Sequence, residues 1–169
     1  MVRHQGPVLV DTNVIVECWR TNGWRALSSG YRIETVEDVV TETQTGFQRR
    51  RREERIDPAV LKDSLANIHR PGDSEFAKLA VQVPDIVLDP GERALWAHAP
   101  TRTDNWILCG PDKASLRMGV RLGFRERLFA LEDLLDAVGF KPKVPLRDNY
   151  TAAWLAQALS EIVVLESRP

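Results

Sequence analysis

A short apolar run, an acidic turn and a helical segment follow one another three times along the chain. The runs span residues 7–10, 86–88 and 106–109, and the acidic residues after them are Asp11, Asp89 with Glu92, and Asp112. Short apolar runs bounded in this way are typical of buried strands, and the apolar spacing after them is typical of helices. Strands that alternate with helices form a parallel sheet with helices on both faces. The pattern therefore predicts an α/β fold, a three-layer α/β/α sandwich with a central, mostly parallel sheet of four to five strands.

The segments between these repeats supply the other expected elements. The stretch YRIETV, residues 31–36, has the aromatic and β-branched composition of a second strand. Residues 57–68 predict a helix, because Asp57 can cap it, Pro58 suits its first position, and apolar residues recur on one face. Further helices are expected over residues 36–47, 49–57, 74–82 and 150–165, and residues 125–140 fit a short fifth strand with a helix.

The composition fits a single domain over residues 1–169, with 43% hydrophobic and 28% charged residues. The net charge of −1 gives no global positive field, so nucleic-acid binding would need a local patch or metal ions. Cys18 and Cys109 belong to no Cys/His array, which argues against a zinc site. Neither a signal-peptide pattern nor a membrane-spanning apolar run is present in the sequence, so we expect a cytoplasmic protein with no membrane partner.

Acidic residues fall where the expected strands end. In a parallel sheet all carboxyl ends lie at one edge, which would bring Asp11, Glu92 and Asp112 together, with Glu42 in reach from the helix after the second strand. Four such carboxylates repel one another unless a divalent cation neutralises them. Oxygen ligands of this kind favour Mg²⁺ or Mn²⁺. The alternative is three separate helix caps and one exposed Glu, with Asp89 and Glu92 spaced as a capping box.

Basic residues offer weaker indications of RNA binding. The run Arg49, Arg50, Arg51 and Arg52 could contact phosphates, as could Arg117 and Arg121 at helical spacing, but a solvated surface explains both sets as well. The five tryptophans lie in apolar segments, which favours packing over base stacking. The three histidines show no metal-ligand spacing.

Four stretches of the chain together resemble the PIN domain, the metal-dependent ribonuclease fold that includes the toxins of VapBC-type toxin–antitoxin pairs. They are VLVDTNVIV with Asp11, TVEDVVTET with Glu42, LDPGERALWAHA with Glu92, and ILCGPDKASLRMGVRLG with Asp112. They occur in the order of the family and span most of the chain, from about residue 7 to residue 140. Their combination is much more specific than any one of them.

The resemblance implies a metal-dependent endoribonuclease. Asp11, Glu42, Glu92 and Asp112 would hold one or two Mg²⁺ or Mn²⁺ ions, and water would cleave the RNA backbone without a covalent enzyme intermediate. Thr12 or Asn13 would orient Asp11 or a water molecule at the metal. The expected partners are an RNA substrate, an antitoxin protein and a second copy of the chain in a homodimer. A Rossmann-type nucleotide-binding domain fits less well, because no GxGxxG or Walker sequence follows any expected strand.

The chain departs from the family pattern at three places. Family members commonly carry Thr or Ser just before the acidic residue that follows the fourth strand, whereas Gly110 and Pro111 precede Asp112 here. This departure motivates a second hypothesis, a catalytically weakened PIN-like scaffold that binds RNA or a protein partner. The other departures are a helical insertion at about residues 46–84 and an extra C-terminal helix at about 150–165, which we interpret as a lid, a dimer surface or a partner-binding arm.

Overall fold

The protein folds as an α/β domain around a five-stranded, all-parallel sheet, in a computed structural model that describes residues 2–45 and 50–169. The strands are β1 Val8–Val10, β2 Ile33–Val36, β3 Asn67–His69, β4 Ile107–Cys109 and β5 Leu128–Phe129. The helices are α1 Thr12–Arg20, α2 Trp24–Gly30, α3 Glu37–Gln44, α4 Pro58–Ser64, α5 Asp73–Gln82, α6 Pro90–His98, α7 Lys113–Arg121, α8 Leu131–Ala137 and α9 Ala152–Glu166. Short 3-10 turns are η2 Arg52–Glu54, η3 Ala99–Thr101, η4 Arg125–Arg127 and η5 Asp148–Tyr150.

The strand order is β3-β2-β1-β4-β5, which confirms the predicted parallel three-layer architecture. The central strand β1 pairs with β2 on one side and with β4 on the other, and all three of its residues are completely buried. A short strand that is apolar throughout suits a position covered by helices on both faces. Because every strand runs the same way, the residues that follow β1, β2 and β4 emerge at one edge of the sheet.

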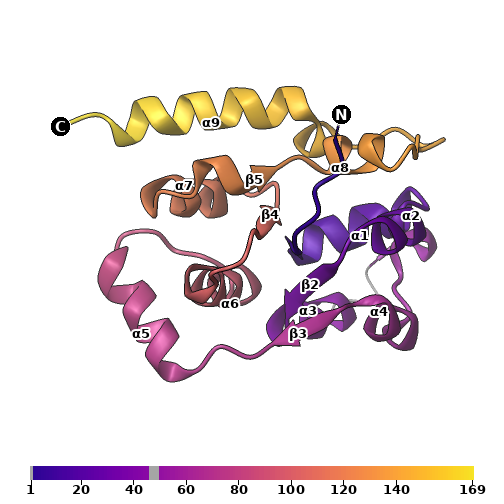
Figure 1. The fold of residues 1–169 in the computed structure, drawn as a ribbon, viewed down its shortest axis with the longest axis horizontal. Coiled ribbons are helices and arrows are strands. Elements are labelled where there is room, and N and C mark those ends of the chain that lie inside the picture. Colours follow the sequence, from indigo (N-terminus) through magenta and orange to yellow (C-terminus); the bar gives the residue numbers. More distant parts are fainter. Residues whose placement is uncertain (1, 46–49) are drawn as a thin grey trace.

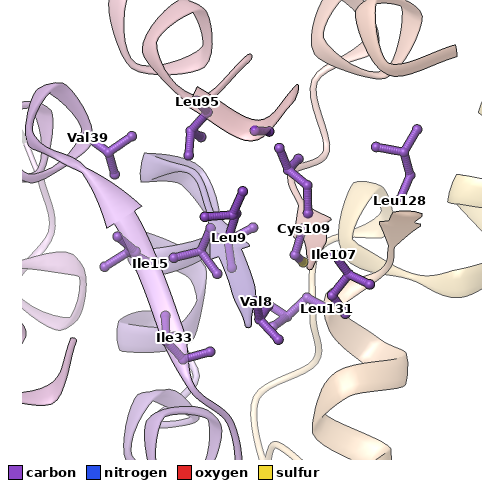
Figure 2. Close-up of a cluster of buried hydrophobic side chains, with 14 of the residues drawn as sticks. Val8, Leu9, Ile15, Ile33, Val39, Leu95, Ile107, Cys109, Leu128 and Leu131 are labelled. Carbon is purple, nitrogen blue, oxygen red and sulfur yellow. The ribbon is translucent and has the colours of Figure 1, made fainter. Parts of the chain in front are cut away.

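Helices cover both faces of this sheet. In Figure 1, α5, α6 and α7 lie to the left of the strands, while α1, α2 and α4 lie to the right. Figure 2 shows Leu9 of β1 near the centre of a group of buried side chains that includes Ile15 of α1 and Leu95 of α6, so helices and sheet contribute to a shared core. The last helix, α9, packs against α7 and α8 and buries Ala158, Leu159 and Ile162.

The strand expected over residues 86–88 is wrong. Residues 86–88 have no regular secondary structure and belong to the connection between α5 and α6. Ile86 and Leu88 instead line an apolar pocket with Phe76 and Met118, so their apolar character serves helix packing. Val87 between them is 88% exposed, which is incompatible with a central strand.

The sheet edge is made by a segment that we expected to be helical. α4 ends at Ser64, and residues 67–69 form β3, parallel to β2. His69 bonds to the buried Glu34 of β2 across 2.7 Å, and this long-range contact outweighs the helical spacing of Leu65 and Ile68. The region expected as a helical insertion therefore also supplies the sheet's edge strand.

Other boundaries differ more modestly. The helix expected over residues 36–47 is α3, which ends at Gln44. The polar segment expected as a helix over residues 49–57 contains only the short turn η2, and residues 46–49, including Arg49, lie outside the described residues. The expected helices over 74–82 and 150–165 and the short fifth strand are confirmed as α5, α9 and β5. In the described part of the chain, no helix has the length and apolar character that crossing a membrane requires.

Candidate metal-binding site

An acidic pocket of about 220 Å³ lies at the carboxyl edge of the sheet. Its lining residues come from the start of α1, from α3 and the segment after it, and from the start of α6: Asp11, Thr12, Asn13, Glu42, Thr45, Arg50, Asp89 and Glu92. Three of the four predicted carboxylates, Asp11, Glu42 and Glu92, are therefore brought to one cavity. Asp112 does not line it, although its charge acts on two of the carboxylates that do.

Asp11 is the most deeply buried of these carboxylates, with 3% of its surface exposed. It follows β1 and caps α1, since its Oδ1 accepts a hydrogen bond of 2.9 Å from Val14 N. Its Oδ2 is buried without a hydrogen-bond partner among the described residues. Burial, together with the charges of Asp89, Asp112 and Glu42, raises the pKa of Asp11 to about 7. Capping thus explains one oxygen of Asp11 and leaves the other unexplained.

Glu42 is held by two donors from other elements. The Thr12 hydroxyl donates to Oε2 at 2.6 Å, and the Gly91 backbone N–H at the start of α6 donates to Oε1 at 2.9 Å. Thr12 was expected to orient Asp11 or a water molecule, but the structure shows it orienting Glu42. The Asn13 side chain is exposed at the pocket, while its carbonyl accepts a hydrogen bond from Tyr150.

Glu92 reaches the pocket from a helix, because no strand precedes it. It lies in the first turn of α6 with 5% of its surface exposed. Burial, with the charges of Asp112, Asp89 and Asp11, raises the pKa of Glu92 to about 8. Two neighbouring carboxylates thus have pKa values near neutrality, which is the expected result of crowding buried acids without a counter-ion.

Asp112 caps α7. Its Oδ1 accepts hydrogen bonds from Ala114 N at 2.8 Å and Ser115 N at 3.1 Å, and the residue is half-buried. It lies close enough to raise the pKa values of Asp11 and Glu92. Its position beside the pocket, after β4, follows from the parallel sheet.

Asp89 is a pocket residue that sequence reasoning assigned only to helix capping. Its Oδ1 accepts a hydrogen bond of 2.8 Å from Glu92 N, so the capping is real. The residue also lines the acidic pocket, and of the neighbouring charges it is the largest contributor to the raised pKa of Asp11. The sequence signal was the acidic turn itself, in which only Glu92 was assigned to the metal site and Asp89 was interpreted as a helix cap.

The predicted arginines separate into two groups. Arg50 lines the pocket and donates to the carbonyls of Glu42, at 2.9 Å, and Thr43 at the end of α3. Arg51 and Arg52 are exposed and are not among the lining residues.

Arg117 and Arg121 of α7 lie away from the pocket lining. Both form ion pairs with Glu166 of α9 and with Asp85, and the distance from Arg121 Nε to Glu166 is 2.7 Å. These contacts give the two arginines a structural role in joining α7 to α9. Contact of these two arginines with RNA phosphates stays a prediction.

The tryptophans and histidines serve packing in the described structure. Trp96 and Trp106 are buried, and the Trp96 indole donates to Ser115 Oγ at 2.8 Å. His69 and His98 stack with ring centroids 3.8 Å apart, next to Arg102.

The donor chemistry of the pocket fits a hard divalent cation, since carboxylate oxygens line it and one buried oxygen has no partner. These side chains are not arranged as a complete set of metal ligands. In the described ranges, no three His, Cys, Asp or Glu side chains are grouped closely enough to hold a metal ion. Carboxylates without a counter-ion repel one another, which is a physical reason for the distance between these side chains.

Comparison with known proteins adds no further constraint: no protein-family model matches this chain, and no curated protein sequence matches it significantly.

Proposed function

We propose that the protein is a Mg²⁺- or Mn²⁺-dependent endoribonuclease of the PIN type. One observation carries the proposal: Asp11 presents a buried, unpartnered oxygen at the carboxyl end of the central strand, in a pocket that it shares with Glu42 and Glu92. A buried carboxylate oxygen without a donor is costly unless something positive binds it. The four acidic stretches that resemble the PIN domain identify the same residues.

Asp11, Glu42, Glu92 and Asp112 would hold the metal. When bound, Mg²⁺ or Mn²⁺ supplies a water of lowered pKa as the nucleophile and neutralises charge on the phosphodiester. Asp11 and Glu92 must be ionised to bind the cation, which a positive charge beside them favours. Thr12 and Gly91 hold Glu42 in a fixed orientation through hydrogen bonds. Arg50 would place a positive charge at the edge of the pocket, where an RNA phosphate arrives.

A second candidate is a PIN-like scaffold that binds RNA or a protein partner without cleaving. The observation that favours it is the lack, among the described residues, of three side chains already grouped for a metal. The two candidates differ in a measurable way, because only the nuclease requires a divalent cation and an intact Asp11.

The test is cleavage of a mixed RNA pool by the purified protein with Mn²⁺, with EDTA, and with the Asp11→Asn variant. Asparagine also caps helices, so this variant keeps the bond to Val14 while it removes the charge. Asp57→Asn is the matched control, because Asp57 caps α4 in the same manner outside the acidic pocket. Cleavage by the wild type and by Asp57→Asn, in Mn²⁺ only, supports the nuclease. RNA binding without cleavage in every arm supports the scaffold.

For the biological role we propose the toxin of a toxin–antitoxin pair, acting on RNA in the cytoplasm and inhibited by its antitoxin. A homodimer is part of this proposal, and the end of α9 offers a surface for it, since Val164 and Leu165 are 56% and 49% exposed. Induced expression tests this role: the wild type should arrest growth, whereas Asp11→Asn should not. Growth unaffected by an active, soluble nuclease would contradict it.

A further inference from the structure

Asp89 has no part in the ligand set described above, yet it lines the same pocket. We propose that Asp89 is a fifth carboxylate of the cation site and binds the divalent ion directly through the oxygen that does not cap α6. This inference rests on the proposed function, because it concerns the same metal site. It changes which residues are expected to hold the ion.

The two oxygens of Asp89 have different environments. Oδ1 accepts the hydrogen bond from Glu92 N at 2.8 Å and thereby fixes the side chain. Oδ2 has no hydrogen bond or ion pair within the described ranges, and the residue is exposed at the pocket. A carboxylate that is anchored by one oxygen and open at the other is suited to bind a cation without a large loss of side-chain entropy.

An independent observation points to a ligand in this pocket. Only 3% of the surface of Asp11 is exposed, its Oδ2 has no hydrogen-bond partner among the described residues, and the residue lines the cavity that Asp89 lines. Asp89 arrives from the turn before α6, and Asp11 arrives from the end of β1. Two carboxylates from separate elements, each with one oxygen free of hydrogen bonds, therefore line one cavity, and a cation between them would satisfy both.

Two of the other acidic residues, Glu42 and Asp112, accept more hydrogen bonds from the protein than Asp89 does. Both oxygens of Glu42 accept hydrogen bonds, from Thr12 and Gly91. Asp112 accepts two backbone N–H groups through Oδ1 and is not among the lining residues. Asp89 thus has an oxygen available to the pocket that Glu42 lacks, and this difference favours Asp89 as a direct ligand.

The alternative is that Asp89 acts only as a helix cap, and the chain contains a matched case of that role. Asp57 precedes Pro58 at the start of α4 as Asp89 precedes Pro90 at the start of α6. Asp57 Oδ1 accepts from Ala59 N at 2.9 Å and from Val60 N at 3.1 Å, away from the acidic pocket. The same substitution at both positions therefore separates capping from cation binding.

The experiment is calorimetric titration of Mn²⁺ into the metal-free wild type, Asp89→Asn, Asp57→Asn and Asp11→Asn. Asp89→Asn should raise the Kd for Mn²⁺ about tenfold or more, Asp57→Asn should leave it unchanged, and Asp11→Asn should abolish binding. Asp89→Ser, which also keeps a capping oxygen, should behave like Asp89→Asn if the asparagine variant does not fold. Wild-type affinity in the folded Asp89 variants, with binding lost in Asp11→Asn, would overturn this inference alone. Absence of Mn²⁺ binding by the wild type would overturn the inference together with the metal-dependent nuclease.

A second measurement separates direct ligation from a charge effect at a distance. Asp89→Cys places a soft thiolate donor at the position, which should shift metal preference from Mn²⁺ toward Cd²⁺. We expect an ultraviolet thiolate-to-metal charge-transfer band when this variant is titrated with Cd²⁺. The wild type should show no such band, because Cys18 and Cys109 are buried. Asp57→Cys is the control for binding at an exposed cysteine. Equal bands in the two variants would overturn direct ligation by Asp89.

Discussion

Gly110 lies directly against the carboxylate of Asp11: a Cβ at position 110 would come within 2.9 Å of Oδ2 and 3.2 Å of Cγ. The end of β4 can approach Asp11 this closely because residue 110 has no side chain. The glycine that departs from the PIN pattern therefore leaves space for the unpartnered oxygen of Asp11.

Gly110→Ala should displace the Asp11 carboxylate and lower Mn²⁺-dependent RNA cleavage about tenfold or more, since small misplacements of catalytic groups are costly. Cleavage rate and Mn²⁺ affinity measured on the folded variant check this. Gly72→Ala serves as the control, because the nearest contact of a Cβ there is the flexible end of Glu75 at 3.1 Å. Unchanged Mn²⁺ affinity and rate in Gly110→Ala would show that the close contact has no functional importance.

Thr12→Val should lower cleavage about tenfold, because it removes the hydroxyl that donates to Glu42 at 2.6 Å. Thr12→Ser keeps a hydroxyl and should retain most of the activity. The rescue by serine distinguishes orientation of Glu42 from a packing effect of the threonine methyl group. Equal activity of the valine and serine variants would contradict a positioning role for Thr12.

The metal-free protein should lose stability as pH rises from about 4 to about 8. Burial raises the pKa of Asp11 from 3.8 to about 7 and that of Glu92 from 4.5 to about 8. In this range the folded state binds more protons than the unfolded state, so the free energy of unfolding falls, by on the order of 3 kcal/mol for Asp11 alone. Denaturant unfolding in EDTA at pH 5 and pH 8 measures the change.

Added Mn²⁺ should restore stability at pH 8, because the cation binds the ionised carboxylates of the folded state. Asp11→Asn should show a weaker pH dependence than the wild type in EDTA. A free energy of unfolding that is the same at pH 5 and pH 8 without metal would contradict the crowding of ionisable groups in the pocket.

Glu34→Gln should destabilise the fold by about 3 kcal/mol, because it leaves buried cationic and imidazole groups without their carboxylate. Glu34 is fully buried, and its Oε2 lies 2.6 Å from Arg102 Nη1 and 2.7 Å from His69 Nε2. Glu37→Gln is the control, since the Glu37–Arg70 pair is exposed and its loss should change stability by less than about 0.5 kcal/mol. Similar unfolding midpoints for the two variants would contradict this role of Glu34.

The sequence predicted the sheet best where apolar runs are buried on both faces. β1, β2 and β4 were all predicted, because their residues are almost completely buried and their flanking turns carry clear signals. β3 was missed because it is an edge strand with an exposed Asn67 and half-buried neighbours, held by the long-range bond from His69 to Glu34. Periodicity within a segment contains no information about such a partner.

The candidate site was predictable to a similar degree. The parallel sheet explains why Asp11 and Asp112 meet at one edge, and the pocket includes Glu42 and Glu92 as expected. The position of Asp89 in the pocket was missed, because its spacing to Glu92 indicates a helix cap and does not show where its second oxygen lies. The ion pairs of Arg117 and Arg121 with Glu166 could not be predicted from the sequence, because they depend on how α9 packs against α7.

The metal site is tested most directly by a crystal of the protein soaked in Mn²⁺, with anomalous difference density calculated around the acidic pocket. We expect a peak within about 2.2 Å of Asp11 Oδ2, bordered by Glu92 and Asp89. A pocket without anomalous density at saturating Mn²⁺, with Asp11 still buried and unpartnered, would contradict the claim that these carboxylates form a metal site.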